Sequence, residues 1–153
     1  MLRTLQRKFG TWSALPGDVR RQLPLALATL AATRCSLSVC GLKGTRRWLD
    51  RMARLRLSRR RDDVGSAGNS IQAVRVAAGV LPVECLCLPK ALATRFLLAR
   101  RGIQAELVLG ARKSENGLDA HAWLELDGQP LGETLDPDMQ PFQPSRPALA
   151  KGT

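Results

Sequence analysis

The chain is poor in aromatic residues and nearly lacks histidine. Its 153 residues include no tyrosine, three phenylalanines, three tryptophans and one histidine, His121. The basic residues are not interleaved with the aromatic side chains that stack on nucleic-acid bases, and no familiar nucleic-acid-binding module surrounds them. We therefore expect no nucleic acid among the partners of this protein.

Long apolar runs are also absent, and cysteines are few. The best apolar run, residues 23–33, is too short to span a bilayer and ends at Arg34. The basic start of the chain leads to no apolar core with a cleavage site, so we expect a cytoplasmic protein without a signal peptide. In a reducing cytoplasm its cysteines remain free thiols. Peripheral membrane contact through the basic, amphipathic residues 1–12 is an open alternative.

Acidic residues are scarce in the first part of the chain. Residues 1–61 carry 15 Lys and Arg against two acids, a net charge of +13, whereas residues 62–153 carry 9 against 11, a net charge of −2. A basic patch of this size favours an anionic partner. By composition we expect a basic helical region at 1–64, a core at 65–136 and a proline-rich, disordered tail at 137–153.

Hydrophobic periodicity predicts an α+β fold, in which N-terminal helices precede a helix packed on a small antiparallel sheet. Gly41 and Gly44 should interrupt the first long helix, and Thr45 should cap the helix that follows. Asp127-Gly128 is typical of a hairpin turn. We expect a polar connection at 59–70, helices at 19–39, 46–57, 71–78 and 88–101, and strands at 104–111, 119–126 and 129–134.

Cys87 and His121 are the candidates for a nucleophile and its base. Cys87 stands where a helix should begin, and a helix N-terminus stabilises a thiolate. Pro89 suits the first turn of that helix. His121 would take the thiol proton and later donate it to the leaving amine. An acid after the hairpin turn would orient the imidazole, and we prefer Glu133 to Asp136 because Glu133 lies nearer the strand.

Strand alternation places His121 on a defined face of its strand. The small alanines on the opposite face would allow close packing against a helix. Trp123 shares the face of His121, where packing is the preferred role and substrate contact the alternative. The first face holds Asp119, His121, Trp123 and Glu125, and the second holds Ala120, Ala122, Leu124 and Leu126.

Residues 71–134 resemble the leader peptidase of lasso-peptide biosynthesis, a cysteine protease of the transglutaminase-like superfamily. The matching segments are Cys87-Leu88-Pro89-Lys90-Ala91-Leu92, residues 97–103, Leu107-Val108-Leu109-Gly110 and Ala120-His121-Ala122-Trp123-Leu124-Glu125. The helical segment 13–57 shows a weaker, compositional similarity to the stand-alone form of this enzyme. The resemblance implies a papain-like core in which Cys87 and His121 are catalytic. The family usually has an aspartate twelve residues beyond the histidine, where this chain has Glu133.

The resemblance also implies an activity and a set of partners. The enzyme would remove the leader from a ribosomally made precursor peptide and expose the amine that a lactam-forming cyclase uses. The basic N-terminal region is too short and too helical for a leader-recognition domain, which implies a separate leader-recognition protein. We expect no cofactor.

Four alternatives remain open. Cys85 is the nearest competitor as nucleophile, although it lies off the helix start. A metal site built from Cys35, Cys40, Cys85, Cys87 and His121 lacks the usual two-residue spacing, so we expect no metal. The other two alternatives concern function. In the first, the protein is a non-catalytic adaptor that delivers the precursor to the cyclase. In the second, it is an acyl transferase of the transglutaminase type that uses an amine in place of water.

Overall fold

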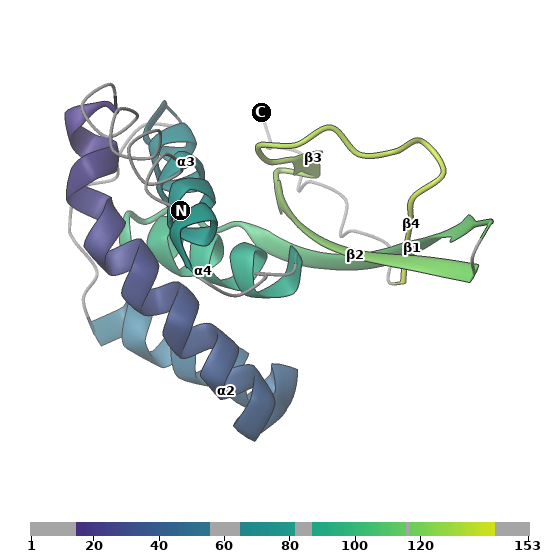
Figure 1. The fold of residues 1–153 in the computed structure, drawn as a ribbon, viewed down its shortest axis with the longest axis horizontal. Helices are drawn as coiled ribbons and strands as arrows, with labels where there is room; N and C mark the ends of the chain where they lie inside the picture. The colour runs from purple at the N-terminus through teal and green to yellow at the C-terminus, as the bar shows by residue number, and fades with distance from the viewer. Residues whose placement is uncertain (1–14, 56–64, 82–86, 116, 143–153) are drawn as a thin grey trace, which may run out of the picture.

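The computed structural model describes residues 15–55, 65–81, 87–115 and 117–142. Three helices form one side of the molecule, and a curled antiparallel sheet projects away from them (Figure 1). The α+β class expected from the sequence is confirmed. In chain order the elements are α2 (Gly17–Leu55), α3 (Gly65–Val80), α4 (Cys87–Arg100), β1 (Glu106–Ser114), β2 (Gly117–Leu126), β3 (Gln129–Pro130) and β4 (Gln140–Pro141).

Helix α2 is long and kinked at a single residue. Gly41 has φ 62° and ψ −175°, values outside the helical region, so the predicted interruption at Gly41 is confirmed. The interruption expected at Gly44 is wrong, because the helix has resumed before it. The Thr45 hydroxyl donates a hydrogen bond to the Gly41 carbonyl at 2.8 Å. Two helices therefore meet at Gly41, as predicted, but Thr45 lies inside the second one, bonded back to the kink, and does not cap it.

Helix α3 begins six residues earlier than predicted, at Gly65 and not at Ile71. The sequence Gly-Ser-Ala-Gly-Asn-Ser is typical of a loop. However, Ala67 is buried, and the buried Ser70 hydroxyl donates a hydrogen bond to Gln22 Oε1 of α2 at 2.8 Å. Packing against α2 thus overrides the local preference for a turn. The polar connection predicted at 59–70 is therefore wrong for residues 65–70, and residues 59–64 lie outside the described residues.

Helix α4 is the centre of the molecule and is buried on two sides. Ala93 and Leu97 face the helices, in an apolar cluster that includes Leu23, Leu30 and Val74. On the other side lies a second cluster, shared with the sheet and formed by Ala67, Ala91, Leu98, Ala105, Ala122 and Leu124. Because two layers pack against it, α4 holds its first residue, Cys87, in a fixed place between helices and sheet.

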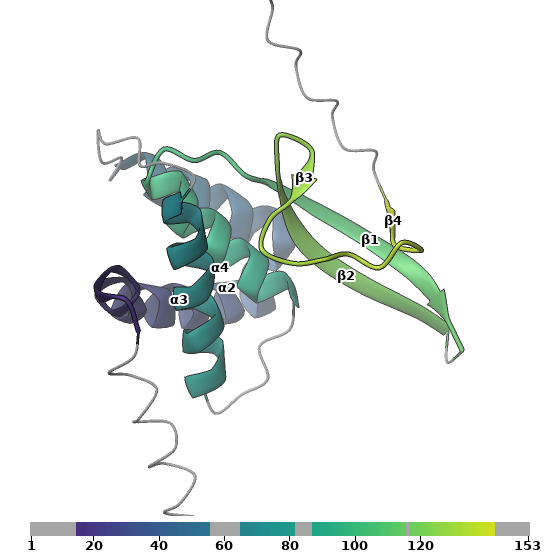
Figure 2. The ribbon, with the colours of Figure 1, turned by 90° about the horizontal axis from the view of Figure 1, so that it is seen from above.

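The sheet has the order β3-β2-β1-β4, and all its neighbouring strands are antiparallel. Strands β1 and β2 form a long hairpin (Figure 2). Asp127 and Gly128, with φ 52° and 77°, turn the chain from β2 into β3. This confirms the Asp-Gly turn. The expected strand 129–134 shortens to two residues of β3, after which the chain crosses the sheet to β4.

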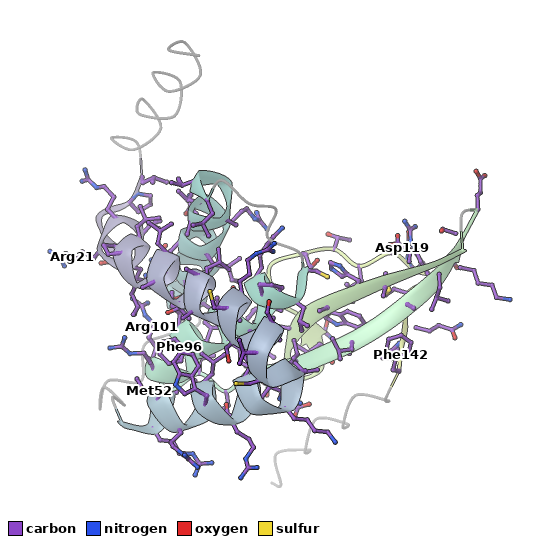
Figure 3. All side chains as sticks on the ribbon, turned by 60° about the horizontal axis from the view of Figure 1, so that its bottom comes forward. Arg21, Met52, Phe96, Arg101, Asp119 and Phe142 are labelled. Carbon is purple, nitrogen blue, oxygen red and sulfur yellow. The ribbon has the colours of Figure 1, made fainter. Side chains whose placement is uncertain are left out.

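The end of the described chain departs from the predicted disordered tail. Residues 137–142 include a short strand: β4 pairs with Gly110 and Ala111 of β1, and the Phe142 amide donates to the Leu109 carbonyl at 2.8 Å. Figure 3 shows Phe142 and Asp119 at the sheet, away from Phe96 and Met52 among the helices. Proline is tolerated here because β4 is an edge strand. The rest of the predicted tail, residues 143–153, lies outside the described residues.

Helix α2 lies before residue 64, the boundary that composition suggested, and it packs directly on residues that lie after that boundary. Asp50 of α2 forms an ion pair with Arg95 of α4 at 2.6 Å, and Leu23 shares a core with Val74 and Leu97. The proposed division at residue 64 stays a prediction. Among the described residues one helix, Gly17–Arg54, is long and apolar enough to cross a membrane by these criteria alone. The apolar stretch therefore continues past Arg34, beyond the predicted run of residues 23–33, and 22% of it is buried. A buried core helix and a signal sequence both meet the same criteria.

Candidate active site

Cys87 is the first residue of α4, one residue earlier than the predicted helix start. Its thiol is free and half-buried. The unpaired backbone N–H groups of the first turn and the helix dipole both favour negative charge at this position. Pro89 is buried in the same turn, where the lack of an N–H costs the helix no hydrogen bond. The sequence therefore places a thiol where its thiolate form is stabilised by the backbone.

His121 and Glu133 are in direct contact. His121 Nε2 lies 2.8 Å from Glu133 Oε2, and the two side chains are 31% and 37% exposed. An ionised carboxylate can only accept a hydrogen bond, so Nε2 carries the proton in the neutral imidazole. Nδ1 is then the unprotonated nitrogen, and it is the atom that can accept a proton from a thiol.

The turn after β2 brings Glu133 back to His121. The Leu131 amide donates to the Leu124 carbonyl at 2.8 Å, so the chain keeps running along β2 after β3 ends. Helix α3 then holds the next residue: Arg75 donates a hydrogen bond to the Gly132 carbonyl at 3.0 Å. Ile71 packs so closely on Gly132 that a Cβ there would lie 2.8 Å from Ile71 Cδ1. Glu133 is therefore placed by contacts on both sides.

Cys87, His121 and Glu133 line the same cavity. It is open to solvent, has a volume of about 190 Å³ and lies where α3, α4, β2 and residues 131–133 meet. Its other lining residues are mainly apolar, and two of them, Arg75 and Lys90, are exposed cations. The lining consists of Ile71, Val74, Arg75, Cys87, Lys90, Ala91, Thr94, His121, Ala122, Leu124, Leu131, Gly132 and Glu133. The structure thus brings the predicted thiol, imidazole and carboxylate to one cleft.

Asp136, the other acid considered for orienting the imidazole, is engaged elsewhere. It forms an ion pair with Arg112, which also bonds Asp119 Oδ2 at 3.1 Å. The hydrogen bond that Arg112 donates to Asp119 and then the charge of Asp136 raise the pKa of Arg112 above its usual value. Asp136 thus ties the chain between β3 and β4 to the β1–β2 hairpin.

Trp123 is packed against the protein and does not line the cavity. It is only 2% exposed, and its ring stacks on that of His121 with centroids 6.2 Å apart and planes 14° apart. Of the two roles considered for Trp123, burial fits packing and does not fit substrate contact. Ala122 and Leu124 lie on the opposite face of β2, in the cluster shared with α4. The predicted alternation along this strand is correct at these positions.

Glu125 lies on the predicted face of His121, but its position in the strand predicted no role for it. It is 7% exposed, and its Oε1 accepts a hydrogen bond from Trp123 Nε1 at 2.9 Å. A glutamate at the end of an alternating strand is typical of a solvent-facing position, so the pattern gave no sign of its burial. Ile71, Arg75 and Gly132 were missed as well, although a glycine just before a candidate acid was a signal for close packing.

The remaining cysteines give no metal site within the described residues. Cys35 and Cys40 are free and exposed on α2. No three His, Cys, Asp or Glu side chains gather in the described ranges in a way that would hold a metal ion. Cys85, the competitor for nucleophile, lies outside the described residues.

A comparison with protein families decides the classification. The model of the transglutaminase-like superfamily matches residues 29–146, well over half of the chain. The chain belongs to the transglutaminase-like superfamily. This superfamily includes cysteine peptidases and acyltransferases, and its match begins within α2 and ends beyond β4. No curated protein and no solved structure matches the chain significantly. The transglutaminase-like assignment thus rests on the family model together with the fold.

Proposed function

We propose that this transglutaminase-like protein is a cysteine peptidase that removes the leader from a ribosomally synthesised precursor peptide during lasso-peptide maturation. One observation carries the proposal: a thiol at a helix start and an imidazole bonded to a carboxylate line one open cleft. A cleft of about 190 Å³ with an apolar lining suits part of an extended peptide. The substrate class and the partners follow from the resemblance of residues 71–134.

The chemistry uses the three residues in sequence. His121 Nδ1 takes the proton of the Cys87 thiol, and the thiolate attacks the scissile carbonyl. The oxyanion forms near backbone N–H groups at the start of α4, which also stabilise negative charge. The imidazolium donates its proton to the departing amine, the peptide C–N bond breaks, and an acyl-enzyme remains. Water, deprotonated by His121, then hydrolyses the thioester and regenerates the thiol. Glu133 orients the imidazole throughout.

We further propose that the protein acts in the cytoplasm with a separate leader-recognition protein and a lactam-forming cyclase. The basic surface of the N-terminal part supports an acidic partner or acidic leader residues. Five cations lie on α2 after the kink: Lys43, Arg46, Arg47, Arg51 and Arg54. Because Asp50 is paired with Arg95, it offsets little of this charge toward a partner.

The test is leader cleavage followed by mass spectrometry. A precursor peptide encoded beside this protein and its recognition protein would be incubated with wild type, Cys87→Ala and Cys85→Ala. We expect cleavage by wild type and Cys85→Ala and its loss in Cys87→Ala. Cys40→Ala is a matched control, because Cys40 is a free, exposed thiol away from the cleft. Cleavage that survives Cys87→Ala would overturn the mechanism.

Membership of a superfamily that also contains acyltransferases keeps a second function open. An acyl transferase would pass the acyl group from Cys87 to an amine and not to water. The same mass spectra separate the two functions, since hydrolysis leaves a free carboxylate on the leader and transfer leaves an amide. Precursor binding without cleavage by any variant would instead support the adaptor function.

A further inference from the structure

Three residues of β2, Glu125, Trp123 and His121, contact one another in a series that leads to the imidazole and on to Glu133. The Glu125 carboxylate accepts a hydrogen bond from the Trp123 indole N–H at 2.9 Å. The indole ring in turn stacks on the His121 ring, with planes 14° apart. His121 Nε2 completes the series by bonding to Glu133 at 2.8 Å. A change at Glu125 can therefore reach the imidazole through one intermediate side chain.

Core packing alone does not account for a glutamate at position 125. The side chain is 7% exposed, and its second oxygen, Oε2, is buried without a hydrogen-bond partner among the described residues. Burying a carboxylate oxygen without a partner destabilises a fold, and apolar residues of similar volume are often better tolerated. The one interaction that an apolar residue at position 125 could not make is the hydrogen bond accepted from the Trp123 indole N–H.

The indole is confined on its other side by main chain. A Cβ at Gly110 of β1 would lie 2.7 Å from Trp123 Cη2 and 2.5 Å from the Gln140 carbonyl oxygen. Only glycine fits at this position, and the Trp123 ring occupies the space against β1, close to the chain at β4. With its N–H held by Glu125 and its far edge against Gly110, the ring has one orientation.

We propose that Glu125 is a positioning residue for His121 and acts through Trp123. The carboxylate fixes the plane of the indole, and the stacked imidazole takes its plane from the indole. In that plane Nε2 meets Glu133 and Nδ1 is left for the thiol proton. The role in catalysis rests on the proposed function, whereas the control of the imidazole by Glu125 is a property of the folded chain by itself.

The chain offers an unusually direct probe, because His121 is its only histidine. The imidazole therefore gives a single set of NMR signals, which respond to the ring current of the stacked indole. We expect Glu125→Leu to shift or broaden these signals. Glu125→Gln keeps an oxygen that accepts the indole N–H, so it should leave them near wild type. Glu106→Gln is the matched control, since Glu106 is the exposed cross-strand neighbour of Glu125.

Peptide cleavage supplies the second measurement. We expect Glu125→Leu to lower kcat by about tenfold or more with little change in KM, because substrate does not touch Glu125. Trp123→Phe, which lacks the N–H donor, should likewise lower kcat and leave KM nearly unchanged. The double variant Trp123→Phe/Glu125→Leu should be no slower than the slower single variant, since both changes break the same series of contacts. Glu125→Gln should restore kcat to near the wild-type value.

Three results would overturn the proposal. They are unchanged His121 signals with wild-type kcat in Glu125→Leu, a Glu125→Gln variant as slow as Glu125→Leu, and losses that multiply in the double variant. If Glu125→Leu does not fold, Trp123→Phe and Glu125→Gln decide by the same two measurements. If wild type cleaves no peptide, the proposed function fails, and the NMR comparison still decides whether Glu125 sets the imidazole.

Discussion

The Glu133 carboxylate accepts a hydrogen bond from His121 Nε2 at 2.8 Å, across twelve residues of chain. This contact selects the imidazole tautomer, because the carboxylate requires a proton on Nε2. Both side chains are about a third exposed, at 31% and 37%, so solvent weakens their electrostatic attraction. The contact therefore matters more for the direction of the imidazole than for the stability of the fold.

Replacing Glu133 should reduce catalysis without unfolding the protein. We expect Glu133→Ala to lower kcat for peptide cleavage by about tenfold to a hundredfold, because the imidazole loses its tautomer and direction. Glu133→Gln should be the milder change, since its amide oxygen can still accept a hydrogen bond from Nε2–H. Steady-state kinetics and thermal unfolding of each variant check this.

Asp136→Asn is the matched control for Glu133. Asp136 lies three residues further along and bonds Arg112, so its substitution should leave kcat close to wild type. A large loss in Asp136→Asn together with a silent Glu133→Ala would reverse the assignment of the orienting acid.

Gly132 should tolerate no side chain, because α3 presses against it. Its φ of 80° costs an alanine about 1 kcal/mol, and the new Cβ would also meet Ile71 Cδ1 at 2.8 Å. We expect Gly132→Ala to displace Glu133 and lower kcat, whereas Gly128→Ala should not. Gly128 has φ 77° and open space around it, so it carries the same backbone strain without the contact.

The double variant Ile71→Ala/Gly132→Ala separates the effect of backbone strain at position 132 from that of the contact with Ile71. Removing the isoleucine side chain makes room for the new methyl group, so part of the lost kcat should return. Equal kcat losses in Gly132→Ala and Gly128→Ala would show that α3 does not help to place Glu133.

Local patterns sufficed to predict α4, the β1–β2 hairpin and the face of His121. Cys87 and Pro89 mark a helix start by their own chemistry, alternating residues mark β1 and β2, and Asp127-Gly128 needs only two residues to specify the turn from β2 into β3. The meeting of His121 with Glu133 was predictable for the same reason, because a tight turn returns the next residues to the neighbouring strand.

Contacts between distant segments decided what the sequence pattern missed. Helix α3 begins at Gly65 because Ser70 bonds to Gln22, which lies 48 residues earlier in the chain, and no local sequence preference indicates that partner. The placement of residues 137–142 beside the sheet depends likewise on the edge of β1 and on Arg112, which binds Asp136. The prolines of this segment suggested a disordered tail, because the sequence did not show that the segment would pair with the edge of β1.

Arg112 should stabilise the sheet in a manner that responds to salt but not to ordinary changes of pH. Its pKa is raised by the hydrogen bond to Asp119 and by the charge of Asp136. A raised pKa on a cation adds stability that persists below its unfolded value and disappears only as the pH rises through the folded value. That window is strongly alkaline. Screening by salt, in contrast, acts on exposed charges at any pH.

We therefore expect Arg112→Gln to lower the thermal midpoint slightly in dilute buffer, by an amount that shrinks as salt is added. The difference from wild type should stay constant between neutral and mildly alkaline pH. A difference that varies across that pH range, or one unaffected by salt, would contradict this account of the ion pairs.

Ser70 should contribute to stability through a buried hydrogen bond between α2 and α3. Its hydroxyl is fully buried and donates to Gln22 Oε1 at 2.8 Å. Ser70→Ala leaves that amide oxygen without its donor, which should lower the free energy of unfolding by about 1–3 kcal/mol. Ser38→Ala is the control: its exposed hydroxyl bonds the Arg34 carbonyl, and its loss should stay within about 0.5 kcal/mol.

Denaturant unfolding of the two serine variants measures both values, and cleavage per folded molecule adds a second comparison. Ser70 precedes Ile71, the residue that packs on Gly132. If the bond to Gln22 only stabilises the fold, Ser70→Ala should cleave peptide normally once folded. If that bond also fixes the position of α3 at the cleft, kcat should fall as it does in Gly132→Ala. Equal unfolding free energies for the two serine variants would show that the buried bond adds nothing, because the amide then finds another partner.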